Sequence, residues 1–184
     1  SEHLIPSNFD YVHLGIPTPY EKRNWFKRWS KHLPKAGKIV LFDRSWYTRA
    51  LIEPTLGYCT KPQYEDFMNK VNDWEKKLIK NGTEIVKFYF SIDKEQQKRR
   101  ISARKNSKLK YWKLSESDQL MVNQWDVFTL YKNQMFDITS TDVAPWIIIN
   151  ANNKMIARLS ALRYILNTFD YEGKVTLEPP KWGE

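Results

Sequence analysis

Four short apolar stretches along the chain have the composition of buried strands. They cover residues 11–14, 38–42, 85–92 and 146–150. Each is rich in β-branched and aromatic residues and shows little alternation between apolar and polar positions. This pattern is typical of strands that are buried on both faces of a parallel sheet.

Five segments between and after these strands have helical spacing of their apolar residues. The second is the clearest, because Thr60 and Gln63 have capping-box spacing, Pro62 suits a first turn and Asn81-Gly82 suits a helix end. Its apolar positions form one stripe: Tyr64, Phe67, Met68, Val71, Trp74 and Leu78. The other four are predicted over residues 20–33, from Asp93 onward, from Ser115 towards Asp137, and over 155–169. The tail from Tyr171 is predicted to be an extended arm.

Strands that alternate with helices predict right-handed crossover connections. The expected fold is therefore α/β, a three-layer αβα sandwich around a mostly parallel sheet, formed as one domain over residues 1–170. In such a sheet the ligand crevice lies beyond the carboxyl ends of the strands. Residues directly after each strand are the first place to look for chemistry.

Composition narrows the class of protein. The 184 residues, 41% hydrophobic and 28% charged, suit one folded domain and contain no apolar window long enough for a membrane span. The single cysteine, Cys59, excludes an internal disulfide and a zinc cluster built on several thiolates. The first residues show no basic segment leading into an apolar core, so we expect no signal peptide and a cytoplasmic location.

The charge balance indicates an anionic partner. Thirty Lys and Arg against 21 Asp and Glu give a net charge of +9. A surplus of this size favours nucleic acid, anionic lipid, a nucleotide or polyphosphate, and charge alone does not choose among them. Most of the 27 aromatic residues are expected to be core rather than base-stacking surface.

The strongest chemical motif follows the second predicted strand, where Asp43 and Arg44 come directly after the apolar run. An apolar strand that ends in Asp is typical of the second phosphate-site motif of P-loop enzymes, in which the carboxylate holds Mg²⁺ beside the transferred phosphoryl group. Arg44 has the geometry to neutralise phosphate oxygens. A plain ion pair between the two residues is the alternative for an isolated motif.

A second motif is a basic segment from Arg99 to Lys113. Arg100 and Arg104 are four residues apart, so they share one helix face and repel unless an anion lies between them. This arrangement suits a lid that closes over phosphates. A solvated basic helix face and an RNA-binding arm are the open alternatives.

At these two motifs the sequence resembles a known family. The run Phe42-Asp43-Arg44-Ser45-Trp46-Tyr47-Thr48-Arg49 is similar to the F-D-R-S-W-Y-N-R signature of the type-2 polyphosphate kinases, which are polyphosphate:nucleotide phosphotransferases. Further matching positions run in order along residues 4–170: Pro17-Thr18-Pro19, Trp25-Phe26, Leu33-Pro34, Gly57-Tyr58-Cys59-Thr60, Arg100-x₃-Arg104, Lys108-x-Lys110-x-Trp112-Lys113, Asp118, Thr139-x-Thr141, Ala144-Pro145-Trp146 and Lys154-x₂-Ala157-Arg158. Ordered motifs over most of the chain make coincidence improbable.

The resemblance implies a P-loop kinase fold of the thymidylate-kinase type, with a helical lid over about residues 99–118. It implies Mg²⁺-dependent phosphoryl transfer between inorganic polyphosphate and a nucleoside mono- or diphosphate, for example from polyphosphate to ADP. The implied catalytic residues are Asp43, which also binds the metal, Arg44, Arg100 and Arg104. The implied polyphosphate-binding residues are Arg49, Lys108, Lys110 and Lys113, and the weaker nucleotide-binding candidates after the last strand are Asn150, Asn152 and Lys154.

Two departures from the family pattern affect this interpretation. Thr48 stands where the family has Asn, so the amide's paired donor and acceptor are replaced by a hydroxyl. The family's glycine-rich phosphate loop has no counterpart among the six glycines of this sequence. We expect either a segment that precedes this sequence or a shortened form of the enzyme, with natural degeneration as the third explanation. A chain without the loop is expected to have little kinase activity.

Two other functions stay open. A non-catalytic module that binds polyanions or RNA accounts for the charge, although we expect no sequence-specific nucleic acid partner. An ATP-dependent nucleoside monophosphate kinase would not need polyphosphate. No membrane partner is expected, and exposed sheet edges favour a homo-oligomer. Other candidates are weaker, since His13 is expected to be a structural histidine and Cys59 to pack in a turn rather than act as a nucleophile.

Overall fold

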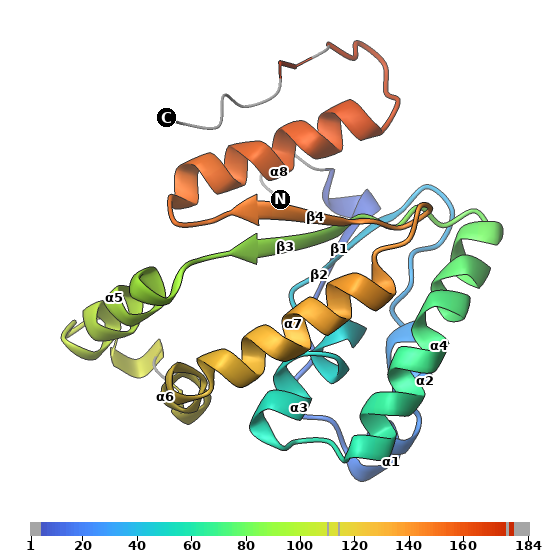
Figure 1. The fold of residues 1–184 in the computed structure, drawn as a ribbon. Coiled ribbons are helices and arrows are strands. Elements are labelled where there is room, and N and C mark those ends of the chain that lie inside the picture. Colours follow the sequence, from blue (N-terminus) through green and yellow to red (C-terminus); the bar gives the residue numbers. More distant parts are fainter. Residues whose placement is uncertain (1–4, 110, 114, 176, 179–184) are drawn as a thin grey trace. The chain divides into compact units, whose positions relative to one another are not determined.

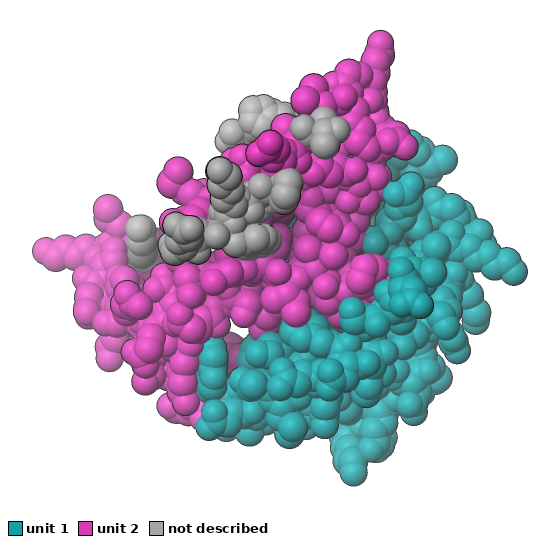
Figure 2. All heavy atoms as spheres, turned by 45° about the horizontal axis from the view of Figure 1, so that its top comes forward, with its two compact units in different colours: residues 1–85, 124–143 teal, residues 86–123, 144–184 magenta. Residues whose placement is uncertain are grey.

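A computed structural model describes residues 5–109, 111–113, 115–175 and 177–178. The chain divides into two compact units, each built from two separate stretches of sequence (Figure 2). Unit 1 comprises residues 1–85 and 124–143, and unit 2 comprises residues 86–123 and 144–184. The prediction of one domain over residues 1–170 stays a prediction.

Unit 1 contains a pair of parallel strands, β1 (Phe9–Val12) and β2 (Ile39–Phe42), which lie side by side in Figure 1. Tyr11 pairs with Leu41 in the register, and the backbone N–H of Asp43 donates to the Val12 carbonyl at 2.9 Å. The pairing thus continues one residue beyond β2. β1 begins two residues earlier than the sequence pattern predicted.

The other elements of unit 1 are helical. They are η1 (Pro6–Asn8), α1 (Pro19–Arg23), α2 (Trp25–Ser30), η2 (Trp46–Arg49), α3 (Ile52–Leu56), α4 (Lys61–Lys80) and α7 (Trp125–Thr139). The longest two, α4 and α7, lie side by side in Figure 1 and are joined by a hydrogen bond from Asn72 Nδ2 to the Ile138 carbonyl at 2.8 Å.

Helix α4 forms for the reasons that the sequence indicates. Thr60 and Gln63 form the reciprocal capping box, and Pro62 occupies the first turn. The apolar stripe is buried at Phe67, Met68 and Val71. The helix ends before Gly82, whose φ of 87° is readily adopted only by glycine.

Two predicted helices are each divided in the structure. The helix predicted over residues 20–33 is broken at Asn24, whose side-chain amide donates to the Tyr20 carbonyl and whose φ and ψ are −118° and 56°. A side-chain bond of this kind competes with the helical backbone. The helix predicted from Ser115 towards Asp137 is broken at Gln124, which leaves the helical region and separates α6 (Glu116–Asn123) from α7.

Aromatic rings form the core of unit 1. Trp46 lies at its centre, with ring centroids 4.9 Å from Trp74, 5.5 Å from Phe42 and 6.3 Å from Trp29. Trp29 is 3% exposed and Trp46 is 6% exposed. The expectation that these aromatic side chains are core is confirmed.

Unit 2 contains the second parallel pair, β3 (Lys87–Ser91) and β4 (Trp146–Asn150). Helix α8 (Lys154–Thr168) packs along β4, as Figure 1 shows, and Ala157 joins Ile149 in a small apolar core. The lid region holds α5 (Lys94–Lys105), η3 (Tyr111–Lys113) and α6. The described part of the tail turns at Gly173, and Asn167 exchanges two hydrogen bonds with the backbone of Leu177.

The α/β class with parallel strands is confirmed, but two details of the predicted sheet differ in the structure. The described strands form two separate two-stranded sheets rather than one continuous sheet. They are also not buried on both faces, since Ile39, Leu41, Phe90 and Ile148 are between 37% and 53% exposed. In β2 exposed and half-buried residues alternate, because within the described residues only one face of this pair is well covered.

Candidate functional site

The carboxyl edge of the β1–β2 pair places Asp43 among polar neighbours. The Tyr11 hydroxyl donates to Asp43 Oδ2 at 2.6 Å, and His13 Nδ1 lies 3.4 Å from the same oxygen. The side chains of Asp43 and His13 are each 53% exposed. The candidate metal ligand is therefore accessible and held from one side by residues of the neighbouring strand.

Tyr11 and His13 are residues that the motif search missed. Tyr11 lies in β1 and His13 directly follows the last residue of that strand, and both side chains contact the same oxygen of Asp43. The hydrogen bond to the Asp43 carboxylate is the main cause that raises the pKa of Tyr11. The phenol thus stays protonated and donates to Asp43 at neutral pH. His13 thus contacts Asp43, and its expected structural role stays a prediction.

Arg44 has a strained backbone. Its φ is 65°, and among the described residues it is the only non-glycine residue with a positive φ. For a residue with a Cβ this conformation costs roughly 1–2 kcal/mol, and such strain gathers at functional sites. The Arg44 side chain is exposed, and no described residue forms an ion pair or hydrogen bond with it. The plain Asp43–Arg44 ion pair is therefore not formed.

The segment after Arg44 is anchored in the core. Ser45 caps η2, and Trp46 donates from its indole nitrogen to Glu75 Oε1 on α4 at 2.9 Å. The Trp46 carbonyl in turn accepts from the indole nitrogen of Trp25 at 2.9 Å. Arg44 is thus followed directly by a segment that hydrogen bonds fix in the core of unit 1. This anchoring keeps the strained backbone of Arg44 in place.

Arg49 lies inside unit 1 rather than on its surface. It is 1% exposed, its Nε lies 2.6 Å from Glu53 Oε2, and its guanidinium carbon lies 4.1 Å from the centre of the Trp25 ring. Burial raises the pKa of Glu53, an effect that the Arg49 charge partly offsets. Burial also raises the pKa of the nearby Cys59 thiol to about 11, so it is not a thiolate nucleophile at neutral pH.

In unit 2 the predicted lid residue Arg100 contacts the predicted nucleotide-binding turn. Its Nη2 donates to the Ala151 carbonyl at 2.6 Å and to the Asn152 carbonyl at 3.1 Å. Asn152 also binds the start of α5, because its amide donates to Asp93 Oδ2 at 2.7 Å. The hydrogen bond from the Gln96 backbone is the main cause that lowers the pKa of Asp93.

The other lid cations lie towards the end of α5 and in the segment after it. Arg104 lies 3.4 Å from Asp118, which forms a capping box with Ser115 at the start of α6. Lys108 is exposed. Lys110 and the side chain of Lys113 lie outside the described part of the structure.

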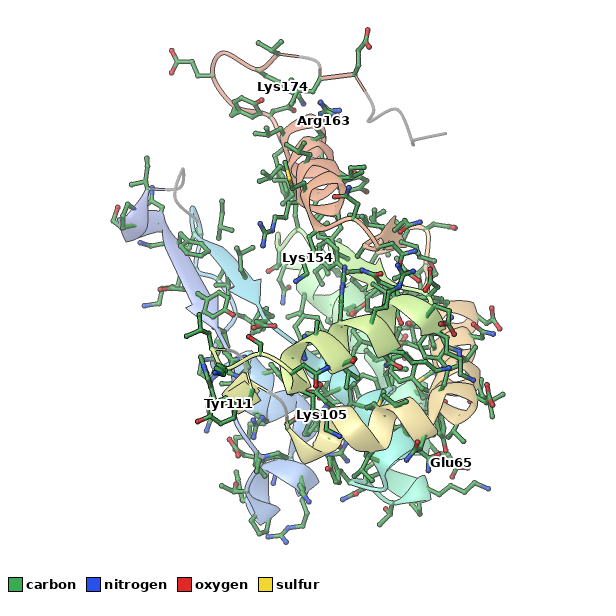
Figure 3. The ribbon with its side chains drawn as sticks, turned by 90° about the vertical axis from the view of Figure 1, so that its left-hand side faces the viewer. Glu65, Lys105, Tyr111, Lys154, Arg163 and Lys174 are labelled. Atoms are coloured by element: carbon green, nitrogen blue, oxygen red, sulfur yellow. The ribbon has the colours of Figure 1, made fainter. Side chains whose placement is uncertain are left out.

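The turn after β4 carries the three weaker candidates. Asn150, the last residue of β4, accepts at its Oδ1 from the Asn152 backbone at 3.0 Å, whereas the Asn152 side chain contacts Asp93. Lys154 is the first residue of α8, where Figure 3 labels it, and its side chain is exposed. Figure 3 also labels Lys105 on the last turn of α5 and Tyr111 on η3, in the basic lid region.

A cavity with a volume of about 470 Å³ lies at this carboxyl edge of β3 and β4. Polar and apolar residues line it, and none of them is cationic: Ser91, Ile92, Asp93, Ile148, Asn150 and Asn152. The cavity suits an uncharged polar group better than a phosphate chain, because its only ionisable side chain is the Asp93 carboxylate.

The residues at Asp43 fit a magnesium ion that binds mainly to substrate. Mg²⁺ commonly takes one or two carboxylates and completes its shell with water and phosphate oxygens. Asp43 offers one accessible carboxylate, and across the residues that the structure describes no three His, Cys, Asp or Glu side chains form a closed metal cluster.

Among the described residues, no helix is long and apolar enough to cross a bilayer.

Comparisons with known proteins agree with these features. The family model for polyphosphate kinase 2 matches residues 1–176. A GDP-polyphosphate phosphotransferase of Mycolicibacterium smegmatis is 41% identical over 174 residues, covering 94% of this chain and 62% of the relative. An NDP-polyphosphate phosphotransferase 2 of Ruegeria pomeroyi is 42% identical over 174 residues, covering 94% of this chain and 51% of the relative. The chain thus spans about half to three fifths of these relatives.

A solved structure supports the fold independently. The crystal structure of polyphosphate kinase 2 from Arthrobacter aurescens TC1 superposes with a TM-score of 0.78 and 35% identity, covering 84% of this chain and 55% of that one. The α/β fold, predicted from the strand and helix pattern, is therefore confirmed, as is the P-loop kinase class that the family resemblance implied. With a family match over nearly the whole chain, the protein belongs to the polyphosphate kinase 2 family.

Proposed function

We propose that this protein transfers phosphoryl groups between inorganic polyphosphate and a nucleoside mono- or diphosphate, with Mg²⁺ as the metal. The names of its relatives, which include GDP-, NDP- and ADP-polyphosphate phosphotransferases, support this reaction class. Those relatives are longer than this chain, so the reaction belongs to the whole protein, with any segment that lies outside this sequence.

The observation that carries the proposal is the pair Asp43–Arg44. One side chain is an accessible carboxylate at the end of a parallel strand, and the other is an unpaired guanidinium on a strained backbone. Phosphoryl transfer needs little covalent chemistry from the protein and depends on positioning and charge neutralisation. The pair offers one group for a cation and one for phosphate oxygens, side by side.

Each residue then has a defined task. Asp43 would hold Mg²⁺, which would supply positive charge beside the reacting phosphate groups. The Tyr11 hydroxyl orients the carboxylate by its 2.6 Å hydrogen bond, and Arg44 binds oxygens of the transferred phosphoryl group. In the lid, Arg100 uses only Nη2 in its contacts with the Ala151 and Asn152 carbonyls, so its other N–H groups are free for phosphate. Arg104, Lys108, Lys110 and Lys113 would extend that contact along the polyphosphate.

The other candidate functions explain less. A non-catalytic polyanion binder accounts for the charge of +9 but gives no reason for strain at Arg44. An ATP-dependent monophosphate kinase would use the same pair without polyphosphate. Assaying the same preparation with polyphosphate or ATP as donor distinguishes these two from the proposed reaction.

The test is Asp43→Asn in a form of the protein that contains the glycine-rich phosphate loop. This change removes the carboxylate charge but keeps an oxygen for the Tyr11 hydroxyl. We expect kcat for ATP formation from ADP and polyphosphate to fall at least about 100-fold, because charge stabilisation at the reacting phosphate is lost. Asp73→Asn on the exposed face of α4 is the matched control and is expected to keep wild-type turnover. Turnover near wild type in Asp43→Asn would show that this carboxylate does not hold the metal.

A further inference from the structure

Helix α8 has two opposite faces that differ in burial. Successive residues of an α-helix are rotated by about 100° from each other, so residues three and four apart share a face. The face towards the core of unit 2 holds Ala157, Ser160, Ala161 and Tyr164. Ala157 is 3% exposed, and the Tyr164 ring lies with its centroid 5.5 Å from that of Phe88. This inward face packs α8 onto the β3–β4 pair.

The opposite face of α8 is apolar and exposed. It carries Met155, Leu159, Leu162 and Leu166, which are 72%, 49%, 51% and 39% exposed. We call this row of four residues the α8 stripe. The four side chains lie within about 60° of each other around the helix, on the side away from β4, which runs beneath α8 in Figure 1. A contiguous apolar row that stays exposed marks an interaction surface.

The spacing of the α8 stripe is that of a helix that packs against another helix. Its residues follow each other at intervals of four, three and four, which is the a/d repeat of a coiled coil. Met155 and Leu162 then occupy d positions. Helices that lie in a membrane surface instead combine a large apolar face with a strongly charged opposite face. The narrow stripe therefore fits a second helix better than a lipid surface, because the opposite face of α8 is buried in unit 2.

Arginines border the stripe on both sides. In the same heptad numbering Arg158 is at a g position and Arg163, labelled in Figure 3, is at an e position. Charges at these positions select the partner and the orientation of a coiled coil. Neither arginine forms an ion pair or a hydrogen bond with a residue that the structure describes. Since α8 contains no Asp or Glu, the stripe is bordered by positive charge alone.

These charges disfavour pairing with a second copy of α8. The e and g positions hold Ile156, Arg158, Arg163 and Ile165. In a parallel pair, Arg158 would face Arg163 of the second copy, and in an antiparallel pair each arginine would face its own counterpart. Every ionic contact across such a pair would join like charges, which is costly at an interface. The complementary partner carries carboxylates at these positions.

We propose that the α8 stripe is the docking surface for an amphipathic helix of a separate partner protein, in which apolar a and d residues are flanked by Asp or Glu at e and g. The partner's carboxylates pair with Arg158 and Arg163, and its apolar seam covers the stripe. The stripe is about 17 Å long, which suits a partner segment of about two heptads. None of the proposed catalytic residues lies on α8, so the proposal goes beyond the proposed function and does not depend on it.

The test is binding of the full chain to two synthetic peptides, each about three heptads long with Leu at a and d. One peptide carries Glu at its e and g positions and the other carries Lys. Neither peptide pairs with itself at neutral pH, because its own e and g charges repel each other. Fluorescence anisotropy of the labelled peptides at about 0.1 M salt measures both affinities.

We expect the wild-type chain to bind the Glu peptide at least about ten-fold more tightly than the Lys peptide. Leu159→Gln and Leu162→Gln change exposed stripe residues and leave the inward face of α8 intact. Each is expected to weaken binding of the Glu peptide about five- to twenty-fold, because apolar contact area is lost. Leu130→Gln, at an exposed apolar position of α7, is the matched control and is expected to change this affinity less than about two-fold.

Reversal of the bordering charges separates docking from a loss of folding. The double variant Arg158→Glu, Arg163→Glu is expected to lose affinity for the Glu peptide and to gain affinity for the Lys peptide, since the ion pairs are then restored with opposite signs. A damaged fold would lower both affinities. The double variant Lys76→Glu, Lys77→Glu makes the same change in net charge at exposed positions of α4 and is expected to keep the wild-type preference.

Several results would overturn the proposal. Equal affinity for the two peptides, or an inverted preference in the Lys76 and Lys77 control, shows that the α8 stripe does not select a helix by its flanking charges. Self-association that Leu162→Gln abolishes, measured by sedimentation, assigns the stripe to a second copy. Binding to phosphatidylglycerol vesicles that Leu162→Gln abolishes assigns it to a membrane. Failure of a longer form that contains the glycine-rich phosphate loop to bind the Glu peptide assigns the stripe to a segment of the same protein.

Discussion

At the residue scale, Glu75 links the candidate site to the core. It lies 32 positions after Asp43 in the sequence, is 1% exposed, and accepts a hydrogen bond from the indole of Trp46. The Tyr47 hydroxyl also hydrogen-bonds to it, and burial raises the pKa of Tyr47 far above its usual value, so the phenol stays a donor. One buried carboxylate therefore holds both aromatic residues that follow the strained Arg44.

Substitutions of Glu75 measure how much its hydrogen bonds to Trp46 and Tyr47 contribute to the stability of the protein. Glu75→Leu leaves two buried donors without their acceptor, and we expect the free energy of unfolding to fall by about 2–5 kcal/mol. Glu75→Gln keeps one side-chain oxygen for Trp46 and is expected to cost about 1 kcal/mol. Urea unfolding followed by tryptophan fluorescence gives both values. If the leucine variant is as stable as the wild type, the Glu75 hydrogen bonds do not anchor this segment.

At the element scale, local signals decided which parts of the fold could be predicted. The start of α4 could be predicted because Thr60, Pro62 and Gln63 lie within one turn and together form its cap. The helix breaks at Asn24 and Gln124 could not be predicted, since neither position carries the glycine or proline that usually marks a helix break. The division of the strands into two pairs depends on which strands meet in space, and apolar composition does not encode that.

The cap of α4 gives a prediction at this scale. Thr60→Ala removes the side-chain oxygen that accepts from the Gln63 backbone, and we expect a loss of about 1 kcal/mol. For a protein of this size that corresponds to a melting temperature about 2–4 °C lower. Thr60→Ser keeps the hydroxyl and is expected to melt within about 1 °C of the wild type. Equal melting of the alanine and serine variants would mean that the capping box adds nothing to stability.

At the scale of the whole molecule, the rule that ligands bind at the carboxyl ends of parallel strands selected the candidate residues. Asp43 and Arg44 directly follow β2, Asn150 is the last residue of β4, and Asn152 lies just after it. The same reasoning missed Tyr11, because its bond to Asp43 exists only once two strands pair. Sequence patterns identify which residues carry chemistry, whereas their partners and their burial come from the tertiary fold.

The net charge of +9 leads to a last prediction, on rates rather than affinities. The field of the whole chain steers anions towards the molecule, whereas contacts at the site decide how long they stay. Replacing the exposed Lys76, Lys77 and Lys80 on the last turns of α4 with Gln removes three charges and leaves Asp43 and Arg44 unchanged. We expect the association rate constant of tripolyphosphate to fall about two- to three-fold at 10 mM salt, with its dissociation rate constant unchanged.

The opposite pattern is expected for Arg44→Ala at the candidate site, in which dissociation becomes faster and association changes little. Stopped-flow tryptophan fluorescence at several salt concentrations separates the two rate constants. At about 0.5 M salt the effect of the triple substitution should disappear, because the screening length is then shorter than the distance between surface charges. A triple variant that still associates at the wild-type rate in low salt would show that the overall field does not guide the anion.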